Sequence, residues 1–548
     1  DTYGLGITSG SNVSHTTATT PNLTFDNLNV GGAGTGTFTH SDGSTLGLTD
    51  LSLGMDSGGS GTYTISNGTL NVSGDVVNGA GTGTLNIDGG TVNAGTIGVD
   101  TLNIGNSGGT NASHTLGSGE SISAGNENIG NSGTGTFTQT GGTKTVSNIL
   151  RLGRESGSSG TYHLSGGSIS ADSEYLGGSG EATFNQTGGT NSASTYFGVG
   201  VFAGSQGVYN LSNTGSLIAS DEYIGEQGTG SFNQTGGTNT VTNDLRIGWT
   251  SGSTGTYSQT DGTNNISNFL TLGNVSGASG TYNLSGTGSL SAGGQTIGHS
   301  GTGVFTQTGG TNSVTNILRL GGESGSSGTY NLSGGSILAD SEYLGSSGEA
   351  TFNQTGGTNS VSSYFGVGVF SGSQGVYNLS NTGSLIAADE YIGEQGTGSF
   401  NQTGGTNTVA NGLRIGWATG SAGTYTISGG TLGVGGSIIN GAGTGTLNID
   451  GGTVTAGTIG VDTLNIGNSA GTNGSHTLGS GESISTGSET IGNSGTGVFT
   501  QTGGTNTISN NLLVGASSGS SGTYNVSGGS FSANNSYIGG SSTASGGS

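Results

Sequence analysis

The sequence contains no cysteine, and Pro21 is the single proline in 548 residues. The lack of cysteine excludes disulfides and the Cys/His spacings of zinc sites, and it leaves the cellular compartment undecided on this ground. We also find no phosphate-binding loop, no convincing nucleophile elbow and no basic–aromatic tract. The usual signatures of nucleotide, metal and nucleic-acid chemistry are therefore missing.

Positive charge is equally scarce. Six Lys and Arg face thirty Asp and Glu, which gives a formal net charge of −24. Such a surface repels nucleic acid and anionic membranes, and it favours solubility and divalent cations. No apolar run approaches the ~20 residues of a membrane span, so we expect neither a nucleic-acid partner nor membrane insertion. No signal-peptide pattern is visible at Asp1-Thr2-Tyr3, so we expect a mature chain or one without such a leader.

Apolar residues make up only 28% of the chain, whereas glycine accounts for 125 positions. Chains of this composition are usually disordered, but here the apolar residues are periodic and the aromatic residues recur at one place in each repeat. A wide globular core is excluded by the composition. A narrow core that extends along one axis needs far fewer apolar residues per coil.

A glycine follows a short apolar segment roughly every 24 residues, from Gly31 to Gly539. In one repeat, residues 161–165, 168–171 and 174–176 each read as a short strand, and Gly166-Gly167 and Gly177 read as turns. No segment shows a helical period. The sequence predicts an all-β fold, a single parallel β-solenoid of about 22 coils with about 24 residues per coil. We expect residues 1–30 to form a cap or assembly segment, 31–539 a continuous array, and 540–548 a Gly/Ser tail.

Aromatic residues at the first-strand position predict a ladder inside the coils, because equivalent residues of stacked coils lie ~4.8 Å apart. The predicted ladder comprises Phe137, Tyr162, Phe184, Tyr209, Phe232, Tyr257, Tyr282, Phe305, Tyr330, Phe352, Tyr377, Phe400 and Tyr425. Two residues later Gln and Leu share an inward position, which suits Gln if its amide bonds along the stack or to a turn.

The sequence contains near-identical internal copies, and a residue needed for catalysis is expected to be kept in both copies of its surroundings. Residues 133–249 recur as 301–417, and Lys144 becomes Asn312 while His163 becomes Asn331. His114 and His476 do recur, each near a glutamate, but acid–base work also requires a pocket and both histidines are expected in exposed loops. The sequence therefore predicts no catalytic residues and a protein that is not an enzyme.

Acidic residues recur just before the third segment of a coil. They are Asp172, Glu174, Asp221, Glu222, Asp340, Glu342, Asp389 and Glu390, and Glu127 and Glu489 occupy the same slot. Alternation places this slot on the face of the buried leucines, where a lone carboxylate is costly. We favour a corner position in which the glutamate accepts backbone N–H bonds; the alternative is Ca²⁺ bound by these oxygens. No other cofactor is expected, and four copies along an array argue against paired carboxylates of a glycosidase.

One residue later the pattern predicts an outward ladder in which Arg side chains lie over Tyr rings. It comprises Arg151, Tyr175, Tyr196, Tyr223, Arg246, Arg319, Tyr343, Tyr364, Tyr391 and Arg414. A stabilised sheet surface is the favoured interpretation, and a face that binds sugar rings or a second rod is the alternative. The segments ending at Phe202 and Phe370, together with Trp249 and Trp417, either contact other molecules or fold over an adjacent coil; we weigh these two readings about equally.

The wording of the repeats resembles a known family. GTYNLSGGSI at 328–337, GTGSFNQTGGTNTV at 228–241 and the closing EYIG or LRLG resemble the bacterial secreted β-strand-repeat proteins that often carry a PEP-CTERM sorting tail, and more distantly autotransporter passenger domains. The resemblance implies export, an extracellular, cell-surface or biofilm-matrix location, and structural or adhesive roles. A sorting tail is not visible here.

These observations predict an extracellular structural protein, a β-solenoid rod that self-assembles head-to-tail or laterally into a surface or matrix filament. The last coil closes at Gly539 without a capping pattern, and we expect its open strand edges to pair with another copy. The alternative is a cell-surface or biofilm adhesin that binds polysaccharide. A polysaccharide lyase or hydrolase is the least favoured reading, because it needs unique residues in a groove.

Overall fold

The computed structural model describes residues 4–7, 11–15 and 22–540. Residues 1–3, 8–10 and 16–21 of the predicted N-terminal segment lie outside the described residues, as does the predicted tail after Gly540. The chain forms two compact units. Unit 1 comprises the described residues up to Asn268 with Gly277–Ser279, and unit 2 comprises Phe269–Ser276 and the described residues from Gly280.

Every regular element in the described part of the chain is a β-strand. The strands up to the unit boundary, which falls within β22, are β1 Gly4–Ile7, β2 Ser11–His15, β3 Leu23–Val30, β4 Thr35–His40, β5 Thr45–Leu53, β6 Ser60–Ile65, β7 Thr69–Asn78, β8 Thr82–Ile87, β9 Thr91–Ile104, β10 Asn111–Leu116, β11 Ser121–Ile129, β12 Thr134–Gln139, β13 Thr143–Leu152, β14 Ser159–Leu164, β15 Ser168–Leu176, β16 Glu181–Gln186, β17 Thr190–Val199, β18 Gln206–Leu211, β19 Ser216–Ile224, β20 Thr229–Val241, β21 Leu245–Ile247 and β22 Thr254–Leu272.

The strands that follow are β23 Ser279–Leu284, β24 Ser289–Ile297, β25 Thr302–Gln307, β26 Thr311–Leu320, β27 Ser327–Leu332, β28 Ser336–Leu344, β29 Glu349–Gln354, β30 Thr358–Val367, β31 Gln374–Leu379, β32 Ser384–Ile392, β33 Thr397–Val409, β34 Leu413–Ile415, β35 Ala422–Val434, β36 Ser437–Ile439, β37 Thr444–Ile449, β38 Thr453–Thr455, β39 Thr458–Ile466, β40 Asn473–Leu478, β41 Ser483–Ile491, β42 Thr496–Gln501, β43 Thr505–Val514, β44 Ser521–Val526 and β45 Ser530–Ile538.

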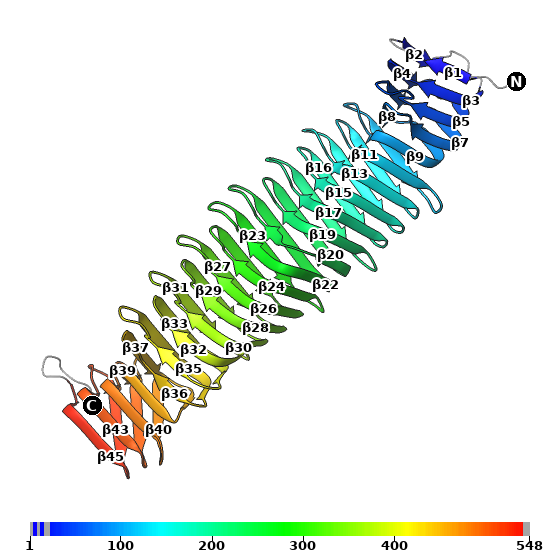
Figure 1. Ribbon diagram of the computed structural model, residues 1–548. Helices are drawn as coiled ribbons and strands as arrows, with labels where there is room; N and C mark the ends of the chain where they lie inside the picture. Colours follow the sequence, from blue (N-terminus) through cyan, green and yellow to red (C-terminus); the bar gives the residue numbers. More distant parts are fainter. Residues whose placement is uncertain (1–3, 8–10, 16–21, 541–548) are drawn as a thin grey trace. The chain divides into compact units, whose positions relative to one another are not determined.

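The fold is a parallel β-solenoid of about 22 coils with roughly 24 residues per turn, as the sequence predicts. Each strand pairs in parallel with the equivalent strand of the next coil; β14, for example, pairs with β16 in unbroken register from Ser159↔Glu181 to Leu164↔Gln186. Within each unit the paired strands lie side by side in successive coils (Figure 1). Because the register repeats, residues of one type stack on their equivalents along the unit.

A typical coil holds two strands rather than the three short ones expected. In the coil of β14 and β15, the predicted second and third segments form the single nine-residue strand β15. The register against β17 shifts between Ala171 and Ser173, which marks a β-bulge. The bulge bends the strand where a corner was expected, so the backbone keeps its ladder bonds and still turns.

The recurring glycine closes each coil because its backbone adopts a left-handed conformation against the next coil. Gly153 has φ +61°, and a Cβ built there would lie 2.1 Å from the carbonyl oxygen of Glu181. Neither the conformation nor the space suits another residue. The period seen in the sequence is therefore set by a backbone corner.

In each unit the core is a narrow column of inward side chains. The thirteen aromatic residues of the expected inner ladder are fully buried. Within unit 1 the centroids of Phe137, Tyr162 and Phe184 are 4.9 and 4.6 Å apart, and within unit 2 those of Phe305, Tyr330 and Phe352 are 4.6 and 4.8 Å apart. The planes of these neighbours differ by at most 19°, so the rings stack face to face.

The inward glutamines satisfy their amides within this column. The Tyr162 hydroxyl donates to Gln139 Oε1 at 2.5 Å, and Gln139 Nε2 donates to the Ser168 carbonyl at 3.1 Å. The same arrangement joins Tyr330 to Gln307 and Gln307 to the Ser336 carbonyl. Each of these glutamines thus accepts a hydrogen bond from a tyrosine hydroxyl and donates one to a backbone carbonyl, both on the next coil, which makes its burial affordable.

Parallel pairing extends over the described residues at both ends of the array. Strands β1 and β2 pair with β3 and β4, so ladder pairing begins before Gly31. In the last described coil, Val526, Phe531 and Ile538 are 55, 41 and 83% exposed, although equivalent positions elsewhere are buried.

Candidate interaction surface

In the outward ladder of unit 1, the residue of β17 that pairs with Tyr175 and Tyr223 is not the tyrosine that the sequence analysis assigned to this position. Tyr175 pairs with Gly198, and Gly198 pairs with Tyr223. Tyr196 lies two residues earlier on β17, paired with Ser173 and Asp221. The assignment of Tyr196 to the same register position as Tyr175 and Tyr223 was therefore wrong, and so was that of Tyr364 in the second copy. Counted back from the closing glycine Gly200, the ladder position is Gly198, just as Tyr175 precedes Gly177 by two residues.

The ring of Tyr196 nevertheless occupies the gap in the ladder, because Gly198 has no side chain. A Cβ on Gly198 would lie 2.3 Å from Tyr196 Oη. Tyr196 contacts Tyr175 edge to face at 4.9 Å and stacks on Tyr223 at 5.2 Å with a 23° angle between planes. Its hydroxyl donates to Glu226. Three half-buried rings thus form a continuous row along the coils.

Arg246 closes this row. Its guanidinium carbon lies 5.0 Å from the ring centroids of both Tyr223 and Trp249. Nη1 donates to Asp221 Oδ1 at 2.6 Å and to Tyr223 Oη at 3.0 Å, and Nη2 donates to Asp244 Oδ2 at 2.5 Å. The arginine is therefore both stacked and neutralised by carboxylates.

Unit 2 carries a copy of this row. Tyr364 contacts Tyr343 at 5.0 Å and stacks on Tyr391 at 5.2 Å, and its hydroxyl donates to Glu394. Arg414 lies 4.7 Å from the Tyr391 centroid and 5.5 Å from that of Trp417, and it donates to Asp389 at 2.8 Å. Gly412 replaces Asp244, so Arg414 has one carboxylate fewer.

The arginines at the other end of each row differ between the copies. The guanidinium carbon of Arg151 lies 5.5 Å from the Tyr175 ring centroid, which is the cation–π contact predicted from the sequence. Burial and the nearby Arg154 charge lower the pKa of Arg151. Arg319 pairs with Tyr343 in the ladder, but its buried Nε has no hydrogen-bond partner. We call these two sets of side chains the aromatic stripes. The stripe of unit 1 comprises Arg151, Tyr175, Tyr196, Tyr223, Arg246 and Trp249, and that of unit 2 comprises Arg319, Tyr343, Tyr364, Tyr391, Arg414 and Trp417.

The segments rich in Phe, Gly and Val begin within strands, since Val199 ends β17 and Val367 ends β30, and only their last three residues follow the strand. Phe197, Val199 and Val201 are buried in the core, and so are Phe365, Val367 and Val369. At the end of each segment Phe202 and Phe370 remain 42 and 41% exposed. Phe202 packs against Tyr175 edge to face at 6.2 Å, and Phe370 packs against Tyr343 at 6.3 Å. Of the two indoles, Trp417 is 38% exposed and Trp249 is half-buried.

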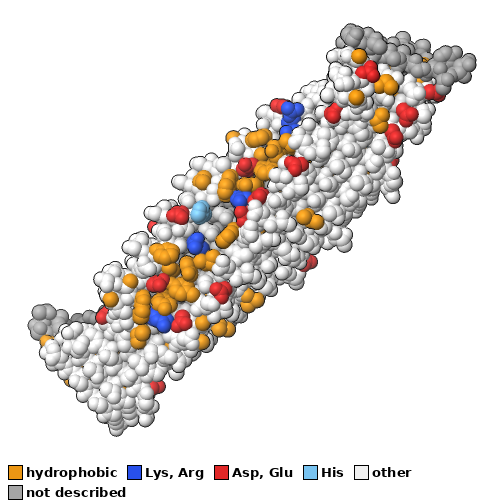
Figure 2. Space-filling view, in the orientation of Figure 1, with side chains coloured by type: hydrophobic (Ala, Val, Ile, Leu, Met, Phe, Trp, Pro, Cys, Tyr) orange, Lys and Arg blue, Asp and Glu red, His pale blue; other side chains and the backbone are white. Residues whose placement is uncertain are grey.

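Figure 2 shows hydrophobic side chains gathered beside Lys or Arg and Asp or Glu side chains on the face that it views. This mixed surface fits the contacts of the stripes, in which rings lie against guanidinium groups that carboxylates neutralise.

The recurring glutamates lie in the core, so the expected corner position was wrong. Glu174, Glu222, Glu342 and Glu390 are fully buried, as are Glu127 and Glu489. Five of these six accept from asparagine side chains, for example Asn191 Nδ2 to Glu174 Oε2 at 3.0 Å, and not from backbone N–H groups. Glu127 instead forms an ion pair with Lys144 at 2.6 Å.

The aspartates beside these glutamates point outward. Asp172 accepts from Thr195 at 2.7 Å and Asp340 accepts from Ser363 at 2.6 Å, and these hydrogen bonds lower the pKa of both carboxyls. Asp221 and Asp389 bind the stripe arginines. The Asp and Glu of each proposed Ca²⁺ candidate therefore lie on opposite faces of a strand and cannot share one ion. Among the described residues no group of three or more His, Cys, Asp and Glu could hold a metal ion.

The recurring histidines are in strands, not in loops. His114 occupies the aromatic-ladder position in β10, paired with Phe137, and is 8% exposed. Burial and the Lys144 charge lower the pKa of His114 to about 4. Glu120 serves its own turn by accepting from the Gly117 N–H at 2.5 Å. Nothing in this geometry pairs the histidine and the glutamate for proton transfer.

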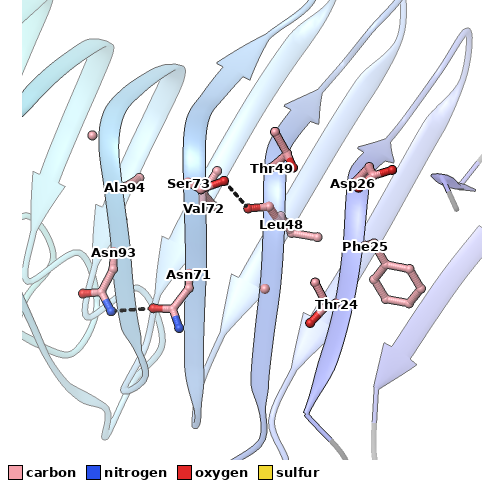
Figure 3. A pocket seen from close by; sticks show the side chains of 12 residues that line it. Thr24, Phe25, Asp26, Leu48, Thr49, Asn71, Val72, Ser73, Asn93 and Ala94 are labelled. Carbon is pink, nitrogen blue, oxygen red and sulfur yellow. Dashed lines mark hydrogen bonds between the residues drawn. The ribbon is translucent and has the colours of Figure 1, made fainter. Parts of the chain in front are cut away.

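A shallow hollow lies on the face of unit 1 near its first coils (Figure 3). Ser73 Oγ donates to the Leu48 carbonyl at 3.3 Å, and Asn93 Nδ2 donates to Asn71 Oδ1 at 2.7 Å. Asp26 is the one ionisable side chain among the twelve described residues that line it. The hollow therefore lacks the second group that acid–base catalysis requires.

Comparisons with known proteins add no relative. No protein-family model, no curated protein and no solved structure matches the chain. In the part of the chain that the structure describes, no helix is long and apolar enough to cross a membrane.

Two features of these surfaces escaped the sequence analysis. The first is the role of Gly198 and Gly366, whose signal was a glycine two residues after a tyrosine in both copies. The second is the asparagine that follows five of the six buried glutamates by seventeen residues, as Asn191 follows Glu174 and Asn359 follows Glu342.

Proposed function

We propose that this protein is an extracellular structural protein whose coils associate side by side with those of a second copy to build a surface or matrix filament. The observation that carries the proposal is the aromatic stripe, present in both units with the same tyrosine row and the same Arg–Tyr–Trp contact at its end. Repeated lateral contacts of this kind allow copies to add without limit. The extracellular placement rests on the resemblance of the repeats to secreted β-strand-repeat proteins.

The state of the rings favours association over ligand binding. Tyr196 and Tyr223 stack on each other, as do Tyr364 and Tyr391, so their faces are already occupied. What remains exposed is the edges of the row and the apolar groups Phe202, Phe370 and Trp417. Exposed apolar groups at repeated sites are typical of protein–protein contacts.

The charge distribution also favours a second copy of the chain as the partner of the stripe. Two copies that each carry a net charge of −24 repel one another over most of their surfaces. The stripes hold four of the six basic residues, and two of these, Arg246 and Arg414, form ion pairs with neighbouring aspartates. The stripe is thus a nearly neutral, partly apolar strip on an acidic chain, and it is where a second copy can approach at the lowest electrostatic cost.

The test is a concentration series by sedimentation velocity and electron microscopy. Wild-type protein is expected to associate laterally. The variant Phe202→Ser/Phe370→Ser/Trp417→Ser is expected to associate only at a protein concentration at least about tenfold higher, which corresponds to a loss of about 1.4 kcal/mol in the free energy of association. The matched control replaces three other exposed apolar residues, Ile218, Leu338 and Ile386, by Ser. Monomers at every concentration, or equal loss in the control, would overturn the proposal.

Polysaccharide binding is the second candidate, favoured by the exposed indole of Trp417 beside Arg414 in unit 2. A glycan array probed with wild-type protein and with Trp417→Ser tests it. Binding that is lost in Trp417→Ser but retained in the Ile218/Leu338/Ile386 control supports an adhesin. An array without hits removes this candidate.

A further inference from the structure

A polar pair crosses the core at equivalent places in several coils. In each pair the second residue follows the first by seventeen positions, so it lies across the column on the next coil. In the described part of the chain, the pairs with a glutamate and an asparagine are Glu174–Asn191, Glu222–Asn239, Glu342–Asn359, Glu390–Asn407 and Glu489–Asn506. All ten residues are 0% exposed.

Each of these pairs is joined by one hydrogen bond and leaves two oxygens unmatched. Asparagine Nδ2 donates to glutamate Oε2 at distances from 2.8 to 3.1 Å. The other glutamate oxygen, Oε1, and the asparagine Oδ1 are buried without a partner in all five pairs. A buried oxygen without a donor is costly, and ten such atoms at equivalent places require one common explanation.

A sixth coil supplies the explanation, because glutamine replaces glutamate there. Gln295 Nε2 donates to Asn312 Oδ1 at 2.6 Å, and Asn312 Nδ2 donates to Gln295 Oε1 at 3.0 Å. The two side chains close a ring of two hydrogen bonds. The glutamine supplies a hydrogen at the position that the unmatched Oε1 occupies in the other five pairs.

We propose that Glu174, Glu222, Glu342, Glu390 and Glu489 are neutral carboxylic acids in the folded protein, each donating its proton from Oε1 to the facing asparagine Oδ1. The solvent supplies one proton to each glutamate as the chain folds. The resulting acid–amide ring has the same two hydrogen bonds as Gln295–Asn312 and satisfies every oxygen. Folding of this core is therefore coupled to the uptake of five protons.

The ionisable groups around the five glutamates favour the neutral form of each carboxyl group. Glu174 is the one member of the five with a cation nearby: Lys144 and Glu127 lie close to it, together with Tyr162 and Tyr209. The ionisable groups near the other four glutamates are tyrosines. They are Tyr209 and Tyr257 for Glu222, Tyr330 and Tyr377 for Glu342, Tyr377 and Tyr425 for Glu390, and Tyr524 for Glu489. Burial raises the pKa of Tyr209, Tyr330, Tyr377 and Tyr425, so these hydroxyls stay neutral. Without a cation beside it, an ionised carboxylate at four of the five sites would be a lone buried charge.

The Glu127 coil shows what an ionised glutamate requires. There Lys144 takes the place of the asparagine, and its Nζ donates to Glu127 Oε1 at 2.6 Å with both side chains fully buried. Nζ also lies 3.0 Å from the Phe137 ring centroid. A charged glutamate is thus matched by a cation, whereas the five others are matched by an amide.

The electrostatics agree with the geometry. Burial raises the pKa of Glu174, Glu342 and Glu489 to about 7 and that of Glu222 and Glu390 to about 8, although the asparagine bond lowers each value. A folded pKa above the unfolded one means that the stabilisation is fully present below pH ~4.5 and is lost as the pH rises through about 7 to 8.

Infrared spectroscopy tests the protonation directly. At pH 6 the folded protein is expected to show the carbonyl stretch of protonated carboxylic acids, and Glu342→Gln/Glu390→Gln/Glu489→Gln is expected to lose about three-fifths of that band. The control Glu349→Gln removes an exposed glutamate of β29 and should leave the band unchanged. A triple variant whose band equals that of the wild type would overturn the proposal.

Denaturation as a function of pH provides the second test. Wild-type and Glu349→Gln protein should lose stability between pH 5 and 8, whereas the triple variant, with rings like that of Gln295, should have a visibly flatter profile and be the more stable at pH 8. If the triple variant does not fold, the single variant Glu390→Gln gives the same comparison for one ring. Parallel profiles for wild type and variant would overturn the proposal even if the band were present.

Discussion

At the residue scale, a missing side chain and a neighbouring ring fit together at Gly198 and Gly366. The tyrosine two residues earlier folds back over the glycine and fills the ladder position that the missing side chain would otherwise leave empty. The sequence contains the register, because Gly198 precedes the closing Gly200 by two residues, as Tyr175 precedes Gly177. That the Tyr196 ring covers Gly198 is decided only by the packing of the coils.

Gly198→Ala should therefore destabilise unit 1 by about 1–3 kcal/mol, the usual cost of overpacking, because the new methyl group overlaps the Tyr196 ring. Urea denaturation measures the loss. In a Tyr196→Ala background the same substitution should cost clearly less, since the overlapping ring is gone. Additive effects of the two substitutions would show that the ring and the glycine are not coupled.

The Lys144–Glu127 pair makes a second prediction at this scale. Lys144→Met leaves a buried carboxylate alone and should cost about 3–5 kcal/mol near pH 7. Lys144→Asn rebuilds the acid–amide pair of the other coils and should cost less at pH 5 than at pH 8. Denaturation midpoints of both variants at the two pH values check this; equal losses at both pH values in Lys144→Asn would contradict it.

At the scale of the element, each coil is held by a glycine corner, a bulge and stacked ladders that repeat in register. Outward asparagines add to these ladders by donating to the equivalent residue of the preceding coil, as Asn210 does to Asn185 at 2.8 Å. The corner glycine and a nearby loop glycine have similar backbone angles but different surroundings. They therefore separate the effect of conformation from the effect of close packing.

Gly153→Ala should be much more destabilising than Gly157→Ala. Both residues have positive φ, +61° and +79°, so both substitutions carry a conformational penalty of about 1–2 kcal/mol. A Cβ at Gly153 would overlap the Glu181 backbone at 2.1 Å, whereas nothing lies within 4 Å at Gly157. Urea denaturation of the two variants measures the difference; equal losses would mean that the corner yields to the added atom.

At the scale of the whole molecule, a high negative charge coexists with neutral interior carboxyls and a few compensated arginines. Repulsion between copies should limit association at low ionic strength. Raising salt from 0.01 to 0.15 M shortens the Debye length from about 30 to about 8 Å. Sedimentation velocity should then show stronger lateral association at the higher salt concentration. Association that weakens with salt would mean that ion pairs, rather than the apolar stripe, hold the copies together.

The same molecule should be most stable below neutral pH. The raised pKa values of the five core glutamates remove stability as the pH rises through about 7 to 8. The pKa of His114 is lowered to about 4, so its contribution is present above pH ~6.5 and is lost as the pH falls toward 4. Because five glutamates lose stabilisation above pH ~4.5 and His114 is a single group acting in the opposite direction, thermal denaturation should show its maximum near pH 4–5. A maximum above pH 8 would contradict the proposed protonation.

The sequence by itself determined the period, the all-β solenoid and the inner aromatic column, because a glycine corner and an alternating strand are local features that recur in every coil. It also placed the glutamate slot on the inward face, although the cost of a buried carboxylate then argued wrongly for a corner. Only the tertiary structure decided that Asn191 faces Glu174, that Tyr196 covers Gly198 and that Asp172 points away from Glu174. These relations depend on contacts across the column and on the bulge in the second strand. Both arise when coils pack on one another, so a single coil's sequence does not contain them.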